Sequence, residues 1–144
     1  MARAILLAAT IAWGVAAVLT LGLAALGAER LEGLLPPLSI DTDALRGALV
    51  AVGMAMGLTA VAHGVVVVGL RAGRRWAWSA GILLAAVLTA TFVALAAAAL
   101  TSAMATPASA PLLVGAGFGA SVGATAYGLV AARLVGELRA GSAA

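Results

Sequence analysis

The chain has 144 residues, of which 65% are hydrophobic and only 9% are charged. A soluble globular domain is typically about half apolar and a quarter charged, so this chain cannot cover itself with polar surface and we expect its solvent to be lipid. The sequence has no cysteine, which excludes disulfides, thiolate metal sites and a cysteine nucleophile. The formal charge of +3 does not indicate nucleic-acid binding, because the basic residues follow the gaps between apolar segments.

Four apolar segments fill nearly the whole chain. A bilayer core of roughly 30 Å is crossed by about 20 apolar residues in a helix. The segments span residues 4–27, 44–70, 77–100 and 111–138. The first is longer than the apolar core of a signal peptide, which is roughly 7–15 residues, so we expect it to be retained as a helix. The sequence therefore predicts an all-α integral membrane protein: one domain over residues 1–144, an antiparallel bundle of four transmembrane helices.

The charged residues predict an orientation. Seven of them fall on one side of the predicted membrane: Arg3, Arg71, Arg74, Arg75, Arg133, Glu137 and Arg139. Two arginines and four acids fall on the other side, so the two balances are +5 and −2, which sum to the stated +3. The positive-inside rule then predicts that both termini are cytoplasmic. Because the composition is rich in Ala, Gly, Val, Leu and Arg, we expect a multi-pass protein of a bacterial cytoplasmic membrane.

A short basic turn joins the second and third segments. Arginines favour lipid phosphates and indole rings favour the headgroup region. We expect membrane-interface anchors at Arg71, Arg74, Arg75, Trp76 and Trp78. Together with Gly69-Leu70 before it, the turn resembles one found in families of small prokaryotic four-helix membrane proteins, in which the second helix ends in Gly-Leu and an Arg-Arg-Trp-Ala turn follows. Those families are uncharacterised, so the resemblance implies a four-helix membrane fold and brings no catalytic residue.

Glycines recur at helical spacing in two segments. We expect helix-packing stripes formed by Gly53, Gly57 and Gly64 and by Gly115, Gly119 and Gly123. Such spacing places residues along one side of a helix, and small residues let two helix backbones approach closely in lipid. The stripes serve either packing within the bundle, which we favour, or contact with another copy or another protein. We also expect the hydroxyls of the intramembrane threonines and Ser121 to form hydrogen bonds between helices.

His63 is the only histidine, and it lies inside the second segment one turn after Thr59. An ionisable residue inside a membrane is a candidate functional residue, but a neutral imidazole can also form a structural hydrogen bond, which we favour. The alternative is a ligand-binding cavity lined by His63, Thr59, Tyr127 and Trp13. Because the segments contain no second histidine and no central carboxylate, we expect no metal, no cofactor and no catalytic residue.

A weak internal similarity links the second and fourth segments. Residues 52–66 align without gaps on residues 116–130, with five identities in fifteen positions. The identities are Gly53/Gly117, Ala60/Ala124, Ala62/Ala126, Gly64/Gly128 and Val66/Val130. Two hairpins repeated in the same orientation would produce this similarity, and so would the frequent recurrence of small residues in membrane helices.

These features favour a non-catalytic membrane protein, either an accessory or assembly subunit or a homo-oligomer. Its expected partners are the lipid bilayer and other membrane-protein subunits or further copies of itself, and not nucleic acid. The alternative function is binding or conduction of a small apolar or lipid-like molecule in a cavity near His63.

Overall fold

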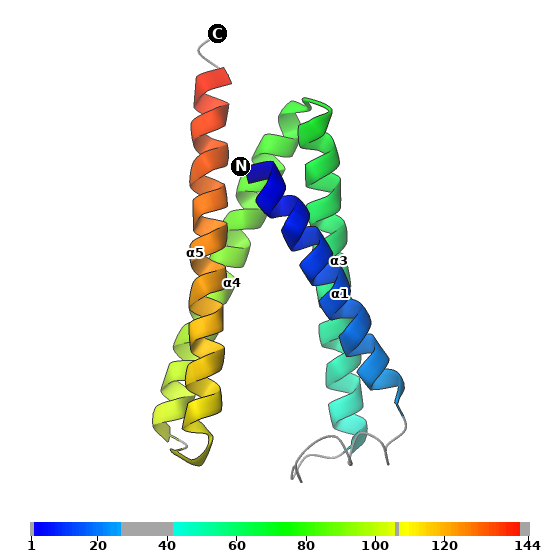
Figure 1. The fold of residues 1–144 in the computed structure, drawn as a ribbon, viewed down its shortest axis with the longest axis vertical. Coiled ribbons are helices and arrows are strands. Elements are labelled where there is room, and N and C mark those ends of the chain that lie inside the picture. The colour runs from blue at the N-terminus through cyan, green and yellow to red at the C-terminus, as the bar shows by residue number, and fades with distance from the viewer. Residues whose placement is uncertain (1, 27–41, 106, 142–144) are drawn as a thin grey trace. The chain divides into compact units, whose positions relative to one another are not determined.

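The computed structural model describes residues 2–26, 42–105 and 107–141 of the chain (Figure 1). Its helices are α1 (Ala2–Ala25), α3 (Thr42–Arg71), α4 (Arg75–Ala105), the short 3-10 helix η1 (Pro107–Ser109) and α5 (Ala110–Gly141). Among these residues, four helices are long and apolar enough to cross a membrane. At a rise of about 1.5 Å per residue, even α1 is about 36 Å long. The predicted all-α class with four helices of membrane-spanning length is therefore confirmed.

The third helix is longer than predicted. We expected a loop from residue 101 to residue 110, but α4 continues to Ala105. Ala103 and Ala105 favour this extension, because alanine is the best helix former. The hydroxyl of Thr101 donates to the carbonyls of Ala97 and Ala98 at 3.0 and 2.9 Å. The 3-10 helix η1 then begins at Pro107. Pro111 lies in the first turn of α5, as expected, where its missing N–H costs nothing.

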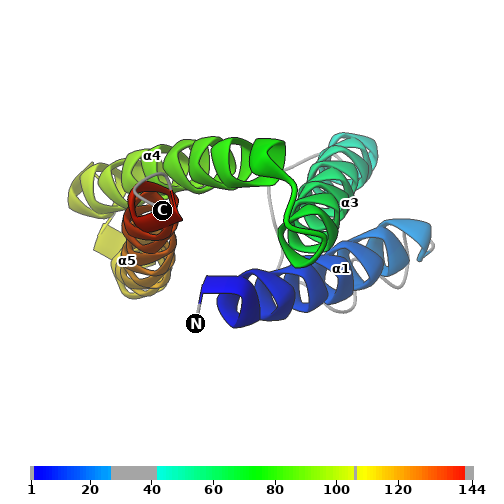
Figure 2. The same cartoon turned by 90° about the horizontal axis from the view of Figure 1, so that it is seen from above.

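The chain forms two compact units, and each is described by itself. One unit, residues 3–67, contains α1 and most of α3, which pack through three glycines of α3. The other unit, which holds residues 68–144, contains the end of α3, α4, η1 and α5. Within it, α4 and α5 lie side by side in both views (Figures 1 and 2). The assembly of all four helices into one bundle, and the single domain over residues 1–144, stay predictions.

The turn between α3 and α4 has a defined backbone geometry. Gly73 has a φ of 66°, in the left-handed region that favours glycine. The N–H of Gly73 donates to the carbonyl of Leu70 at 3.3 Å, and the N–H of Arg74 donates to that of Gly69 at 3.0 Å. This pair of bonds is a Schellman motif, which satisfies carbonyls at the end of a helix. The carbonyl of Arg74 then accepts from the N–H of Ala77 at 3.1 Å and so begins α4.

Gly69 allows α4 to pass very close to the end of α3. A Cβ atom at this position would lie 2.7 Å from the Cβ of Ala77 and 2.9 Å from the ring of Trp76. Such distances are too short for a side chain, so the position requires glycine. The conformation of the turn thus depends on two glycines, one for a left-handed φ and one for a close approach.

We predict that Gly69→Ala destabilises the protein by about 1–3 kcal/mol, because the added methyl group overpacks this contact. Thermal unfolding of the purified protein in mild detergent measures the effect. The control is Gly47→Ala, on the same helix, where nothing lies within 4 Å of the added Cβ. This control should be neutral or slightly stabilising, since alanine has the higher helix propensity. Equal effects of both substitutions would contradict the close approach.

Candidate functional site

His63 is completely buried, and its ring bonds to its own helix. Its exposed fraction is 0%, and its Nδ1 lies 2.7 Å from the carbonyl oxygen of Thr59. A carbonyl can only accept, so Nδ1 carries the proton and donates. The hydroxyl of Thr59 in turn donates to the carbonyl of Ala55 at 2.8 Å. These hydrogen bonds of the two residues therefore run along α3.

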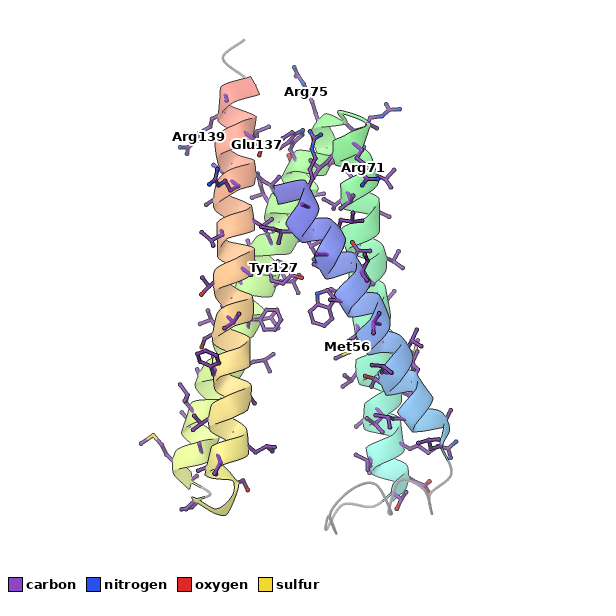
Figure 3. The ribbon with its side chains drawn as sticks, viewed as in Figure 1. Met56, Arg71, Arg75, Tyr127, Glu137 and Arg139 are labelled. Carbon is purple, nitrogen blue, oxygen red and sulfur yellow. The ribbon has the colours of Figure 1, made fainter. Side chains whose placement is uncertain are left out.

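The other two residues of the predicted ligand-binding set lie on different helices. Trp13 is half-buried on α1, in the same unit as His63. Tyr127 is 7% exposed on α5, in the other unit (Figure 3), and its ring stacks on that of Phe92 with a centroid distance of 5.9 Å. The four residues thus belong to two different units, and a cavity lined by all of them stays a prediction.

The predicted glycine stripes have two kinds of environment. In α3, Cβ atoms at Gly53, Gly57 and Gly64 would lie 2.7, 3.9 and 3.7 Å from side-chain atoms of Leu21, Ala17 and Thr10 respectively. In α5, a Cβ at Gly123 would lie 3.1 Å from the ring of Phe92. Gly115 and Gly119 are exposed, with nothing within 4 Å of a Cβ at either position. The α3 stripe therefore faces α1, whereas the first two glycines of the α5 stripe face open space.

Most of these hydroxyl groups bond within their own helix and not, as expected, between helices. The hydroxyls of Thr10, Thr20, Thr89, Thr91, Ser121 and Thr125 donate to the carbonyl four residues earlier in their own helix, at 2.8–2.9 Å. This local bond competes with any partner on a neighbouring helix, because it needs no tertiary structure. The hydroxyl of Thr20 also donates to the sulfur of Met56 at 3.7 Å, which is a hydrogen bond between α1 and α3 of the expected kind.

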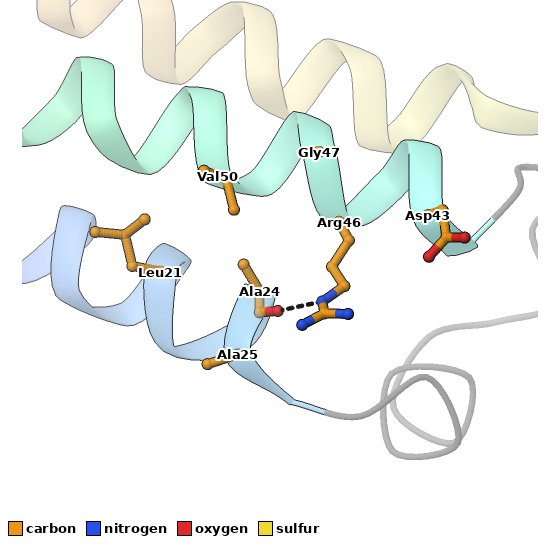
Figure 4. A pocket seen from close by; sticks show the side chains of 7 residues that line it. All are labelled: Leu21, Ala24, Ala25, Asp43, Arg46, Gly47 and Val50. Carbon is orange, nitrogen blue, oxygen red and sulfur yellow. Dashed lines mark hydrogen bonds between the residues drawn. The ribbon is translucent and has the colours of Figure 1, made fainter.

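An open groove of about 450 Å³ lies between the end of α1 and the start of α3 (Figure 4). It is lined by Leu21, Ala24, Ala25, Asp43, Arg46, Gly47 and Val50. The Nε of Arg46 donates to the carbonyl oxygen of Ala24 at 2.9 Å. This carbonyl is in the last turn of α1, where a helix leaves its carbonyls unsatisfied and its dipole favours a cation. Arg46 therefore caps α1 from the neighbouring helix.

The predicted interface anchors gather near the turn. Arg71, Arg74 and Arg75 are exposed, Trp76 is 51% exposed and Trp78 is half-buried. In the same unit, Arg71 and Arg75 lie at the same end as Glu137 and Arg139 of α5 (Figure 3). Trp76 has a second role that the sequence did not suggest, because one side of its indole covers Gly69.

Sequence reasoning missed two packing residues in α4 and α5. Gly117 is buried, and a Cβ there would lie 3.5–3.6 Å from atoms of Ala96, Ala99 and Leu100. Phe92 stacks on Tyr127 and covers Gly123. Gly117 lies outside the four-residue spacing of Gly115, Gly119 and Gly123. Its alignment with Gly53 could have identified its packing role.

Within the described part of the chain, no three His, Cys, Asp or Glu residues come together in a group that could hold a metal ion. Comparisons with protein-family models, with curated proteins and with solved structures found no match.

We predict that His63 is needed for its volume more than for its polarity. His63→Ala should destabilise the protein by about 2–5 kcal/mol through the cavity it leaves. His63→Leu, which restores an apolar side chain of similar size, should cost less than about 1.5 kcal/mol. The carbonyl of Thr59 loses little in either variant, because it already lies in the hydrogen-bond ladder of a helix. Unfolding in detergent measures both, and a Leu variant as unstable as the Ala variant would contradict a packing role.

Proposed function

We propose that this chain is a non-catalytic integral membrane protein of the bacterial cytoplasmic membrane. In this proposal it associates through the exposed glycine face of α5, either as an accessory or assembly subunit or as a homo-oligomer. One observation carries the proposal. Gly117 and Gly123 pack on α4, whereas Gly115 and Gly119 on the same helix are exposed with open space above them.

The surroundings of these two glycines support association. Helices in lipid gain no hydrophobic driving force from pairing, so they associate through close backbone approach at small residues. Val122 follows at the next helical step and is exposed. Beside it, an open groove of about 440 Å³ runs along α5, lined by Phe118, Ser121, Val122, Thr125, Ala126 and Leu129. A neighbouring helix could place its side chains in this groove while its backbone approaches Gly115 and Gly119.

Binding of a small apolar or lipid-like molecule near His63 is the competing function. The burial of His63 and the hydrogen bond of its Nδ1 to its own helix support packing instead. A binding residue must present an atom to its ligand, and an exposed fraction of 0% leaves His63 no surface for one.

We further propose that the turn between α3 and α4 faces the cytoplasm, and that both termini lie on the same side of the membrane as this turn. The exposed cations Arg71 and Arg75 lie at the same end of their unit as Arg139 (Figure 3). Cytoplasmic connections of membrane proteins carry an excess of such residues.

The association proposal predicts that the protein purified in mild detergent is larger than a monomer, or carries a second membrane protein in fixed ratio. Light scattering coupled to size-exclusion chromatography measures this. Gly119→Leu should convert the protein to a free monomer, because the larger side chain prevents close backbone approach. Gly136→Leu is the matched control, since Gly136 is also exposed and open on α5. A wild-type protein that is monomeric and pure under these conditions would overturn the proposal.

The orientation can be tested with single cysteines, because the chain has none of its own. We predict that Ala72→Cys, in the turn, reacts with a membrane-impermeant maleimide in inside-out vesicles and not in spheroplasts. Ala105→Cys, at the other end of α4, should show the reverse pattern. Labelling of both cysteines from the same side would show that α4 does not cross the membrane.

A further inference from the structure

We infer that the two hairpins are two copies of one helical hairpin, in which α1 is equivalent to α4 and α3 is equivalent to α5. The five identities between residues 52–66 and 116–130 are weak support by themselves. Burial and helix–helix contacts supply independent support, because they depend on geometry and not on residue identity. This inference does not rest on the proposed association.

Burial follows the alignment of α3 on α5. The buried positions of residues 52–66 and their equivalents are Gly53/Gly117, His63/Tyr127 and Val66/Val130, and both members of every pair are buried. The additional buried residue of the second segment, Ala120, is aligned with the half-buried Met56. Gly53/Gly117 and Val66/Val130 are also identities, whereas His63/Tyr127 agrees in burial although the side chains differ.

One contact then aligns the first helices of the two hairpins. Gly53 packs on Leu21 in the first hairpin, and Gly117 packs on Leu100 in the second. If these are the same contact, Leu21 corresponds to Leu100, a shift of 79 residues (100 − 21). This shift was chosen from a single pair, so the rest of α1 and α4 tests it.

The remaining residues of α1 agree with this shift. Its buried residues are Leu6, Ala17 and Ala24, and the shift of 79 moves them onto residues 85, 96 and 103. Those are Ala85, Ala96 and Ala103, which are the buried residues of α4 over the equivalent stretch 83–104. Two surfaces with the same buried positions pack in the same register.

Polar and aromatic positions agree as well. Thr10 corresponds to Thr89, and each donates its hydroxyl to the carbonyl four residues earlier at 2.8 Å. Those carbonyls belong to Leu6 and Ala85, which are themselves equivalent. Trp13 corresponds to Phe92, and both are half-buried.

The equivalence assigns a counterpart to the stacked rings of the second hairpin. Phe92 and Tyr127 form that stack, and their equivalents are Trp13 and His63. The first hairpin combines a large indole with a small imidazole, whereas the second combines two six-membered rings. The total volume of the two side chains is therefore similar in the two hairpins, although each position has changed.

The copies also differ. Leu21 and Gly53 are 32 residues apart (53 − 21), whereas Leu100 and Gly117 are 17 apart (117 − 100), so the connection in the second hairpin is 15 residues shorter. A Cβ at Gly64 would meet Thr10, but nothing lies within 4 Å of a Cβ at the equivalent Gly128. The shared register is therefore closest in the half of each hairpin that contains Gly53 or Gly117.

Disulfide formation in the full-length chain tests the register, because there are no native cysteines. The pairs Leu21→Cys with Gly53→Cys and Leu100→Cys with Gly117→Cys should both oxidise to intramolecular disulfides. They should do so roughly tenfold faster than control pairs in which the second cysteine replaces Val52 or Phe118, whose side chains point away. Intact mass after maleimide treatment measures the oxidised fraction. Rapid oxidation of one pair without the other would overturn the inference.

Exchange of the aromatic pair is the second test. Trp13→Phe and His63→Tyr should each lower the melting temperature, while the double variant should recover most of the loss, because it restores the combination found in the second hairpin. Volume-conserving changes are the ones that cores tolerate best. A double variant whose loss equals the sum of the two single losses would show that the positions are uncoupled and would overturn their equivalence to Phe92 and Tyr127.

Discussion

Satisfaction of backbone hydrogen bonds inside each helix is the constraint on which this structure depends. In apolar surroundings an unsatisfied N–H or C=O costs several kcal/mol, and long helices satisfy nearly all of them locally. Exceptions arise at helix ends, and the chain provides for two of these. The Schellman motif after Leu70 satisfies the end of α3, and Arg46 reaches across to the carbonyl of Ala24 at the end of α1.

Because the backbone hydrogen bonds are satisfied within each helix, the closest contacts between helices are set by the positions of glycines. Gly53, Gly117 and Gly123 each receive a side chain of the neighbouring helix, and Gly69 receives both Trp76 and Ala77. Gly115 and Gly119 have the same residue type but no such neighbour in the described structure. Glycine thus occurs both at contacts within a hairpin and on an exposed helix surface that could form a further contact.

The four helices could be predicted because length and apolar composition alone define them, although α4 ends at Ala105 and not at the predicted residue 100. The partner of each helix face could not. Spacing showed that Gly115, Gly119 and Gly123 share a side of one helix, but not that Phe92 covers only the last of them. For the same reason the role of Gly117 was missed. The bond of Arg46 to Ala24 could not be predicted either, since no local pattern reveals a carbonyl on another helix.

The threonine hydroxyls have a consequence for how such a chain is made. Those of Thr10, Thr20 and Thr89 each bond to a carbonyl one turn earlier in their own helix, so their polarity is satisfied before any neighbouring helix is present. A segment of this kind needs no partner helix to satisfy these hydroxyls in apolar surroundings. Formation of each helix and pairing of the helices are then separable events.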